Sequence, residues 1–192
     1  TYTAGTLTAG TNAWTFASTT SGQTISGAGT THDFPITFNG VGGVWTLGSN
    51  FTVGATRVTT LTNGTLALST FAWSTGQFTS NNANTRSITA GTGGKITCTF
   101  ATAATLFDTT TITGLTTSGN PTVEYAGSAA IARTISVGAL SEANAFSFLN
   151  SCTAGSIVFT ATNTFYSVTL NGVGSTVSNI AITLYGNLSV SR

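Results

Sequence analysis

Apolar and polar residues alternate along most of the chain in short runs. In residues 34–38, 95–100 and 122–125, every second side chain is apolar, and threonine is the commonest residue at the positions between. A period of two residues is typical of strands, in which successive side chains point to opposite faces. Runs of the same kind occur at residues 14–16, 44–47, 51–53, 66–68, 131–137, 157–159, 165–170 and 180–184. The pattern predicts an all-β protein of short strands.

Glycine and asparagine separate these runs. The pairs Asn39-Gly40, Asn63-Gly64 and Asn171-Gly172 predict turns between strands. Pro35 is expected near the start of a strand, where its missing amide hydrogen is tolerated. Residues 139–148 are the best helix candidate, and we expect one turn at most, beginning at Ser141 and Glu142.

Some runs echo one another. Residues 38–42 are similar to 170–174, residues 50–53 to 187–190, and residues 85–91 to 132–138, with a weaker relative at 55–61. The spacing between echoes is not constant, which indicates a degenerate repeat. No linker or change of composition divides the chain, so residues 1–192 are interpreted as a single β-rich structural module. Because the chain contains no methionine, we expect it to be processed or part of a longer protein.

Two architectures fit short strands separated by turns. One is a parallel β-solenoid (β-helix), in which strands of successive coils stack, and the other is a jelly-roll-like β-sandwich. The degenerate repeats, the abundance of threonine and the scarcity of charge favour the solenoid. Charge is disfavoured in stacked ladders, because like charges would face one another.

Composition narrows the range of functions. Charged residues make up 5% of the chain and the net charge is +1, whereas about 25% is usual for a soluble domain. Such a chain has no field to attract nucleic acid or anionic lipid. Its apolar stretches are too short for a transmembrane helix. A nearly neutral surface favours association, which suggests a subunit of a larger assembly.

The texture of residues 36–53, 59–69, 85–96 and 156–170 resembles the Thr/Gly/Asn-rich β-helical repeats of phage virion proteins (fibres, spikes and head decorations) and bacterial adhesins. The resemblance covers most of the chain but includes no specific motif. It implies a structural role and homo-oligomers, often trimers. It carries no catalytic residue that can be transferred to this chain.

Acidic residues and histidine are scarce. A glycosidase needs two carboxyl groups flanking one bond, and the candidates are Asp33, Asp108, Glu124 and Glu142. We expect these to face solvent or to pair with arginine. On a strand, His32 and Asp33 would point in opposite directions and could not form a catalytic pair. Because threonines precede them and Pro35 follows, we expect a surface turn here. One histidine and two cysteines do not form a zinc set.

Other candidate motifs have structural interpretations. The glycines at 40–43 and 91–94, the latter before Lys95, lack the phosphate-loop patterns and predict tight turns. Cys98 and Cys152 are expected to be buried thiols, with a disulfide as the alternative if they stack on adjacent layers. The sequons at Asn50, Asn63 and Asn187 are attributed to chance in a chain rich in Asn, Thr and Ser.

Two surface functions need a specific arrangement of side chains. A sugar-binding face would use exposed aromatic rings, and the candidates are Trp14, Trp45, Trp73, Tyr125, Tyr166 and Tyr185. Packing in a core or a subunit interface is the favoured interpretation. An ice-binding face would need an even array of threonines. The Thr-x-Thr pairs at 1–3, 6–8 and 97–99 are not evenly spaced along the sequence.

Together these features predict a non-enzymatic structural protein with no catalytic, cofactor-binding or metal-binding residues. The expected location is a virion surface or the extracellular space. Expected partners are copies of itself, other virion or surface proteins and host surface glycans, without nucleic acid or membrane. The alternatives are a bacterial surface adhesin or filament module, and a carbohydrate-binding or depolymerising tailspike domain.

Overall fold

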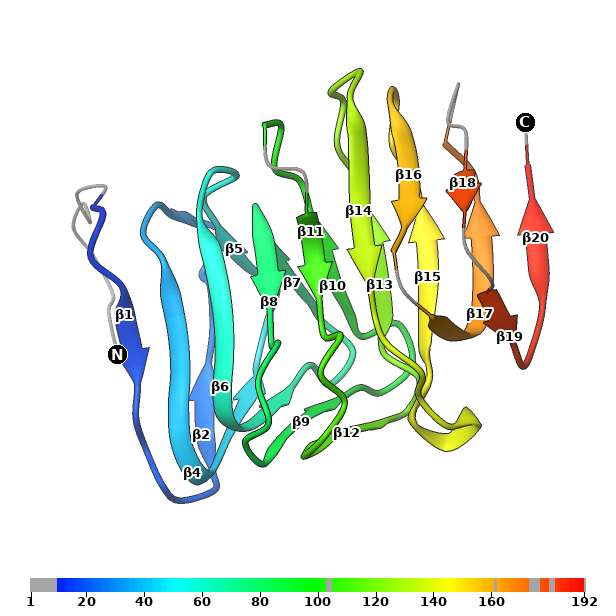
Figure 1. Cartoon of the computed structure of the whole chain (residues 1–192). Helices are drawn as coiled ribbons and strands as arrows, with labels where there is room; N and C mark the ends of the chain where they lie inside the picture. The colour runs from blue at the N-terminus through cyan, green and yellow to red at the C-terminus, as the bar shows by residue number, and fades with distance from the viewer. Residues whose placement is uncertain (1–9, 103–104, 161, 173–176, 180–181, 192) are drawn as a thin grey trace.

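The chain is a parallel β-solenoid of about eight turns. The structure is a computed structural model and describes residues 10–102, 105–160, 162–172, 177–179 and 182–191. Its described strands form an 11-stranded and a 9-stranded sheet. Figure 1 shows the stack from the side, with the two chain ends at opposite ends. Every described strand pair is parallel, so the solenoid prediction is confirmed and the sandwich alternative is wrong.

The strands stack in three series, which we call face 1, face 2 and face 3. Faces 1 and 2 belong to the 11-stranded sheet and are joined by the long strands β4 (Ile36–Leu47) and β6 (Val58–Ala67), whose first and second halves pair with different neighbours. Face 1 also contains β1 (Trp14–Phe16), β8 (Gln77–Thr79), β11 (Thr105–Asp108), β14 (Ala132–Ser136), β16 (Ser156–Phe159) and β18 (Val177–Asn179). Face 2 also contains β2 (Gln23–Ile25), β9 (Arg86–Thr89) and β12 (Leu115–Ser118).

Face 3 is the 9-stranded sheet. Its members are β3 (Thr31–His32), β5 (Phe51–Val53), β7 (Ala72–Thr75), β10 (Lys95–Cys98), β13 (Thr122–Tyr125), β15 (Phe146–Asn150), β17 (Asn163–Leu170), β19 (Ile182–Leu184) and β20 (Leu188–Val190). The helix candidate at 139–148 is a single 3-10 turn, η1 (Glu142–Asn144), followed at once by β15. The expectation of one turn at most is therefore confirmed.

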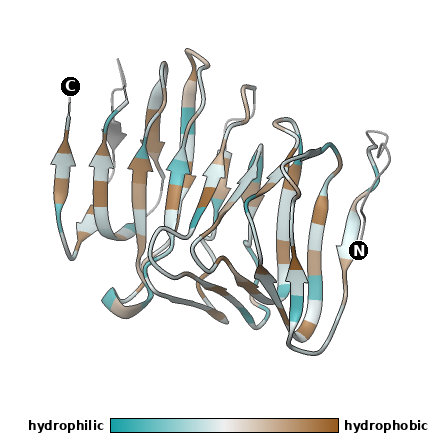
Figure 2. Ribbon diagram, turned by 180° about the vertical axis from the view of Figure 1, so that it is seen from behind, coloured by the Kyte–Doolittle hydropathy of each residue, from teal (hydrophilic) through white to brown (hydrophobic). Residues whose placement is uncertain are grey.

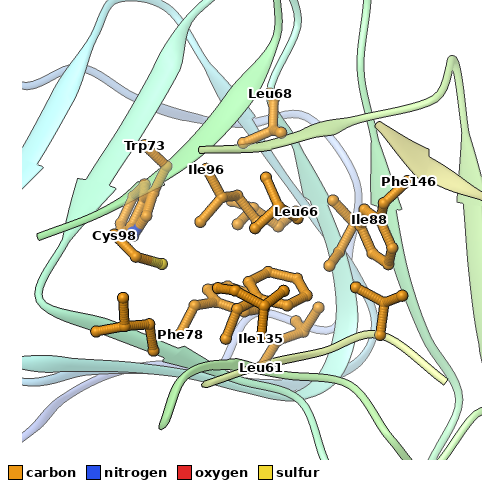
Figure 3. Close-up of a cluster of buried hydrophobic side chains, with 14 of the residues drawn as sticks. Leu61, Leu66, Leu68, Trp73, Phe78, Ile88, Ile96, Cys98, Ile135 and Phe146 are labelled. Atoms are coloured by element: carbon orange, nitrogen blue, oxygen red, sulfur yellow. The ribbon is translucent and has the colours of Figure 1, made fainter. Parts of the chain in front are cut away.

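Alternation along each strand sends apolar side chains into one continuous core. On β6, for example, Thr59, Leu61 and Leu66 are fully buried while the threonines between them are partly exposed. Figure 2 shows this alternation as bands of differing hydropathy along the strands. Figure 3 shows side chains from different faces meeting in the interior, among them Trp73, Phe78 and Ile88.

Aromatic rings stack between neighbouring coils. On face 3 the ring of Phe51 lies between His32, with centroids 4.4 Å apart, and Trp73, at 4.6 Å. On face 1 Phe78 stacks on Phe107 at 5.2 Å. Such contacts add to the burial energy of each ring. Stacking of equivalent side chains in successive coils therefore both follows from the geometry of this fold and adds to its stability.

Asn171-Gly172 directly follows the end of β17, as predicted, but the other two asparagine-glycine pairs do not end strands. Asn39-Gly40 lies inside β4 and Asn63-Gly64 inside β6, where the two asparagines are register partners. The Asn63 Nδ2 atom donates a hydrogen bond to Asn39 Oδ1 at 2.7 Å. Gly64 has a φ of +85°, and a Cβ atom there would lie 2.6 Å from the Gly40 carbonyl oxygen. These pairs bend a strand around the corner between faces 1 and 2 instead of reversing it.

One pair of similar segments, residues 50–53 and 187–190, occupies equivalent positions in the stack of strands. Phe51 and Leu188 belong to one inward row of face 3, which runs through Trp73, Ile96, Val123, Phe148 and Val168. In contrast, the echo of residues 85–91 and 132–138 places Arg86 on face 2 and Arg133 on face 1. The coil length also varies, so a fixed period cannot describe the repeat.

Candidate functional site

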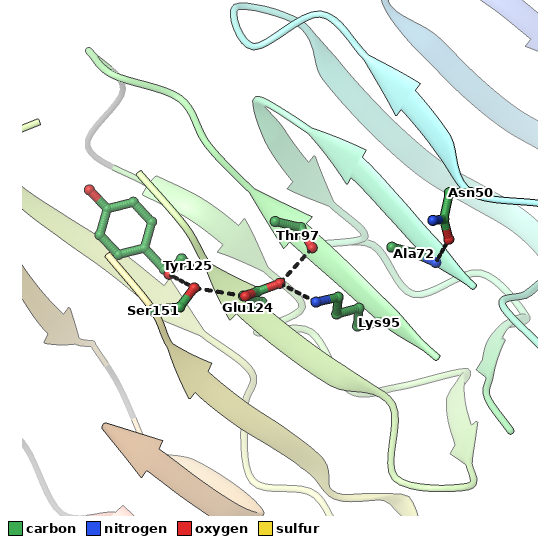
Figure 4. A network of polar contacts seen from close by, with 7 residues as sticks. All are labelled: Asn50, Ala72, Lys95, Thr97, Glu124, Tyr125 and Ser151. Carbon is green, nitrogen blue, oxygen red and sulfur yellow. Dashed lines mark hydrogen bonds and ion pairs between the residues drawn. The ribbon is translucent and has the colours of Figure 1, made fainter. Parts of the chain in front are cut away.

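The most extensive polar network around a carboxylate surrounds Glu124 on the outer side of face 3 (Figure 4). Lys95 Nζ lies 2.8 Å from Glu124 Oε2, and Thr97 Oγ1 donates to the same oxygen at 2.9 Å. Ser151 Oγ donates to Glu124 Oε1 at 2.7 Å. These residues come from β10, β13 and the end of β15, so three successive coils are joined through one carboxylate.

The surroundings of Glu124 favour its charged form. Burial alone would raise the pKa of this carboxyl, but hydrogen bonds from Lys95, Ser151 and Thr97 outweigh it and hold the pKa below its ordinary value. A general acid needs a raised pKa. The network is therefore suited to stabilising the stack and unsuited to acid catalysis.

The remaining carboxylates are dispersed. Asp33 forms two hydrogen bonds with Arg57, at 2.8 and 3.1 Å, and this contact holds the Asp33 pKa below its ordinary value. Asp108 is on face 1, where it accepts hydrogen bonds from Asn81 and Thr110. Glu142 lies on the exposed turn η1. Among the described residues, no two of the four occupy the same strand or paired strands.

The ring of His32 is part of an aromatic stack on face 3. The ring stacks on Phe51, and its Nε2 atom lies 3.5 Å from the Thr30 hydroxyl oxygen. His32 is in β3, whereas the sequence predicted a surface turn, and Asp33 follows the strand and pairs with Arg57 instead. No group of three or more potential metal ligands occurs in the described part of the chain.

The two cysteines are separated in the stack. Cys98 is the register partner of Tyr125, which in turn is the partner of Asn150, two residues before Cys152. Cys98 and Asn150 are therefore two strand spacings apart, or about 9.5 Å between their Cα atoms. A disulfide needs Cα atoms less than about 7 Å apart. Both cysteines are free and buried, and burial raises the Cys98 pKa to about 12.

The aromatic candidates do not form one face. Trp45, Trp73 and Tyr125 belong to the core. Trp14 is 49% exposed in the first coil and stacks on Phe34 at 4.2 Å. The other exposed candidates are Tyr166 and Tyr185, in the last two coils. An open hollow at the first coil is lined by Thr15, Phe16, Ala17, Ser18, Gln23, Thr24, Ile25 and Trp45.

Sequence reasoning missed two buried arginines. Arg86 is 1% exposed and donates to carbonyl oxygens of Ser80, Asn84, Thr111 and Thr113, at the corner between faces 1 and 2. Arg133 is fully buried and donates to the carbonyl oxygens of Phe100 and Ala101, at the corner between faces 3 and 1. Each arginine lies two residues before a buried isoleucine, Ile88 or Ile135, and so points to the same side of its strand. This alternation was the signal in the sequence that could have identified the two arginines as buried.

The sequon asparagines and the glycines before Lys95, also considered as candidates, take part in hydrogen bonds and turns within the stack. Asn50 Oδ1 accepts a hydrogen bond from the Ala72 amide (Figure 4), and Asn63 is engaged with Asn39. Gly91 and Gly94 precede β10 in a tight turn, with Lys95 directed to Glu124. The threonine pairs at 1–3 and 6–8 lie outside the described residues. None of the described residues belongs to a helix long and apolar enough to cross a membrane.

Comparison with models of known protein families, with curated proteins and with solved structures finds no match to this chain.

Proposed function

We propose that this chain is a non-enzymatic structural module of a virion surface, as part of a fibre, a spike or a capsid decoration. Its role is mechanical: parallel backbone ladders and a continuous apolar core resist unfolding, and neutral outer faces pack against copies of itself or against neighbouring proteins. The few charged residues with strong contacts stabilise the stack, as Glu124 and Arg86 illustrate. The assignment to a virion rests on the resemblance in sequence texture.

The observation that carries the assembly role is the apolar character of the last described coil. Leu188 is 62% exposed and Val190 58%, although both lie on strand positions that are inward elsewhere on face 3. In the described residues β20 pairs on one side only, with β17. Exposed apolar side chains beside an open strand edge favour pairing with a further strand, whether from this protein or from another copy.

The test is the oligomeric state of the purified chain, measured by light scattering, together with a density map of the native particle. We expect a homo-oligomer, and we expect Leu188→Asp to shift it toward monomer. Ser189→Asp is the matched control, because Ser189 lies on the same strand with its side chain on the outer side. A stable monomer that occupies no position in a particle would contradict the proposal. Density on a bacterial cell surface would favour the adhesin alternative.

Glycan binding is a second candidate, supported by the hollow at the first coil. Phe16 provides apolar ring surface there, while Gln23, Ser18 and Thr24 provide hydrogen-bonding groups, a combination that suits a sugar ring. A glycan array probed with the purified chain tests it. We expect Gln23→Ala to weaken any binding several-fold and Thr60→Ala, on the outer side of face 1, to leave it unchanged. Absence of binding across the array would remove this candidate.

A further inference from the structure

Face 2 presents a two-row array of small side chains to solvent, which we call the hydroxyl face. One row is Thr24, Thr46, Ala67, Thr89 and Ser118, and the other is Val44, Thr65, Ser87 and Thr116. The positions between the rows, such as Trp45, Leu66 and Ile88, are buried. The array is therefore formed by the outward residues of five stacked strands, β2, β4, β6, β9 and β12.

The chemistry of the hydroxyl face differs from that of the outer side of face 3. All nine side chains are small and uncharged, and none is buried. Within the part of the chain that the structure describes, none of their hydroxyl groups makes a side-chain hydrogen bond. On face 3, by contrast, Thr97 and Ser151 bond to Glu124, and Ser147 bonds to Ser167 at 3.0 Å. The hydroxyl groups of face 2 remain available to water.

The spacing of the array is set by the fold. Neighbouring strands lie about 4.8 Å apart, and alternate residues of one strand about 6.7 Å apart. In a tetrahedral water lattice, two molecules bonded to a common third lie about 4.5 Å apart, because an O–H···O bond measures about 2.75 Å. The repeat along each row therefore lies within a few tenths of an ångström of a repeat of ice. Unequal coil lengths do not disturb it, since the extra residues lie outside the paired segments of face 2, in loops or at the corner within β4.

We propose that the hydroxyl face binds the surface of ice. Threonine and serine hydroxyls bond to lattice water, while the methyl groups of threonine, valine and alanine occupy the gaps between those molecules. The absence of charge from the array matters, because a charged group would orient water around itself and disrupt the lattice. This activity is separate from the structural role proposed above and does not require assembly.

Thermal hysteresis of the purified full chain, measured by nanolitre osmometry, tests the proposal directly. We expect a measurable gap between the melting and freezing temperatures, with faceted crystals. Thr89→Lys, between Ala67 and Ser118 in one row, is expected to reduce the gap several-fold. The matched control is Thr60→Lys, which lies in the outward row Thr37, Thr60 and Thr79 of face 1 and should keep the full gap.

Circular dichroism establishes that each variant is folded, and Ser87→Lys in the second row replaces Thr89→Lys if that variant fails to fold. A folded wild-type chain without hysteresis would overturn the proposal, whatever the variants do. Equal loss in Thr89→Lys and Thr60→Lys would also overturn it, because the activity would not then be located on face 2.

Discussion

Trp73 and Leu188 occupy the same inward row of face 3, yet Trp73 is completely buried and Leu188 is 62% exposed. The difference lies in their neighbours. β7 has a paired strand on each side, β5 and β10, whereas the described residues give β20 one partner, β17. In a solenoid each coil is buried by the coils above and below it, so equal sequence positions contribute unequally to stability. Among the described coils, the middle ones are covered on both sides and the last one on a single side.

The largest effect is expected where burial is complete. Trp73→Ala removes a ring that stacks on Phe51 and donates from Nε1 to Thr59 Oγ1 at 3.0 Å. We expect a loss of about 3–5 kcal/mol in the free energy of unfolding, measured by urea denaturation. Leu188→Ala, in the same row, should cost less than about 0.5 kcal/mol. Similar losses of unfolding free energy in Trp73→Ala and Leu188→Ala would show that position in the stack does not determine what a residue contributes to stability.

Removal of a buried arginine is expected to have the next largest effect. Arg86→Ala leaves the carbonyl oxygens of Ser80, Thr111 and Thr113 without this donor, and we expect a cost of about 1–3 kcal/mol. Denaturation of the variant measures it. Arg57→Ala, which removes the more exposed contact with Asp33, is the control and should cost clearly less. If Arg57→Ala proved the more harmful, the corner role of Arg86 would be wrong.

The Glu124 network predicts a loss of stability in acid. Because the folded-state pKa of Glu124 is lowered, its contribution is complete above the unfolded-state pKa, about 4.3, and disappears as the pH falls through the folded-state value. Glu124→Gln should therefore be less stable than the wild type at pH 7, with a smaller difference at pH 3. Glu142→Gln, on the exposed turn η1, should match the wild type at pH 7. A pH-independent difference for Glu124→Gln would contradict the charged network.

The smallest expected effect is a difference in how readily local opening of the stack exposes the two cysteines at neutral pH. Cys98 and Cys152 are both buried, so neither should react with a thiol reagent in the closed state. Opening from the C-terminal end requires fewer coils to separate at Cys152 than at Cys98. We expect Cys152 to be labelled first, as determined by mass spectrometry of digested samples over time. Simultaneous labelling of both would mean that the stack opens as one unit.

Part of this architecture could be predicted from local sequence. The period-two alternation around Phe38, Ile96 and Val123 correctly identified strands whose inward residues are buried. Two of the three asparagine-glycine pairs misled the prediction of turns, because Asn39 and Asn63 are held by each other across two coils. The partners of Arg86 and Arg133 could not be assigned, since half of their acceptors are backbone carbonyls 25 to 33 residues away in the chain.

The sequence by itself determined that the chain is all-β and sparingly charged, because alternation and side-chain shape act over a few neighbouring residues. It also indicated a degenerate stack. Only the tertiary structure decided the register, which brings Thr46, Ala67 and Thr89 into one row and separates Cys98 from Cys152 by an intervening strand. The physical reason is that register depends on backbone pairing and core packing across coils of unequal length, and these long-range contacts leave no fixed period in the sequence.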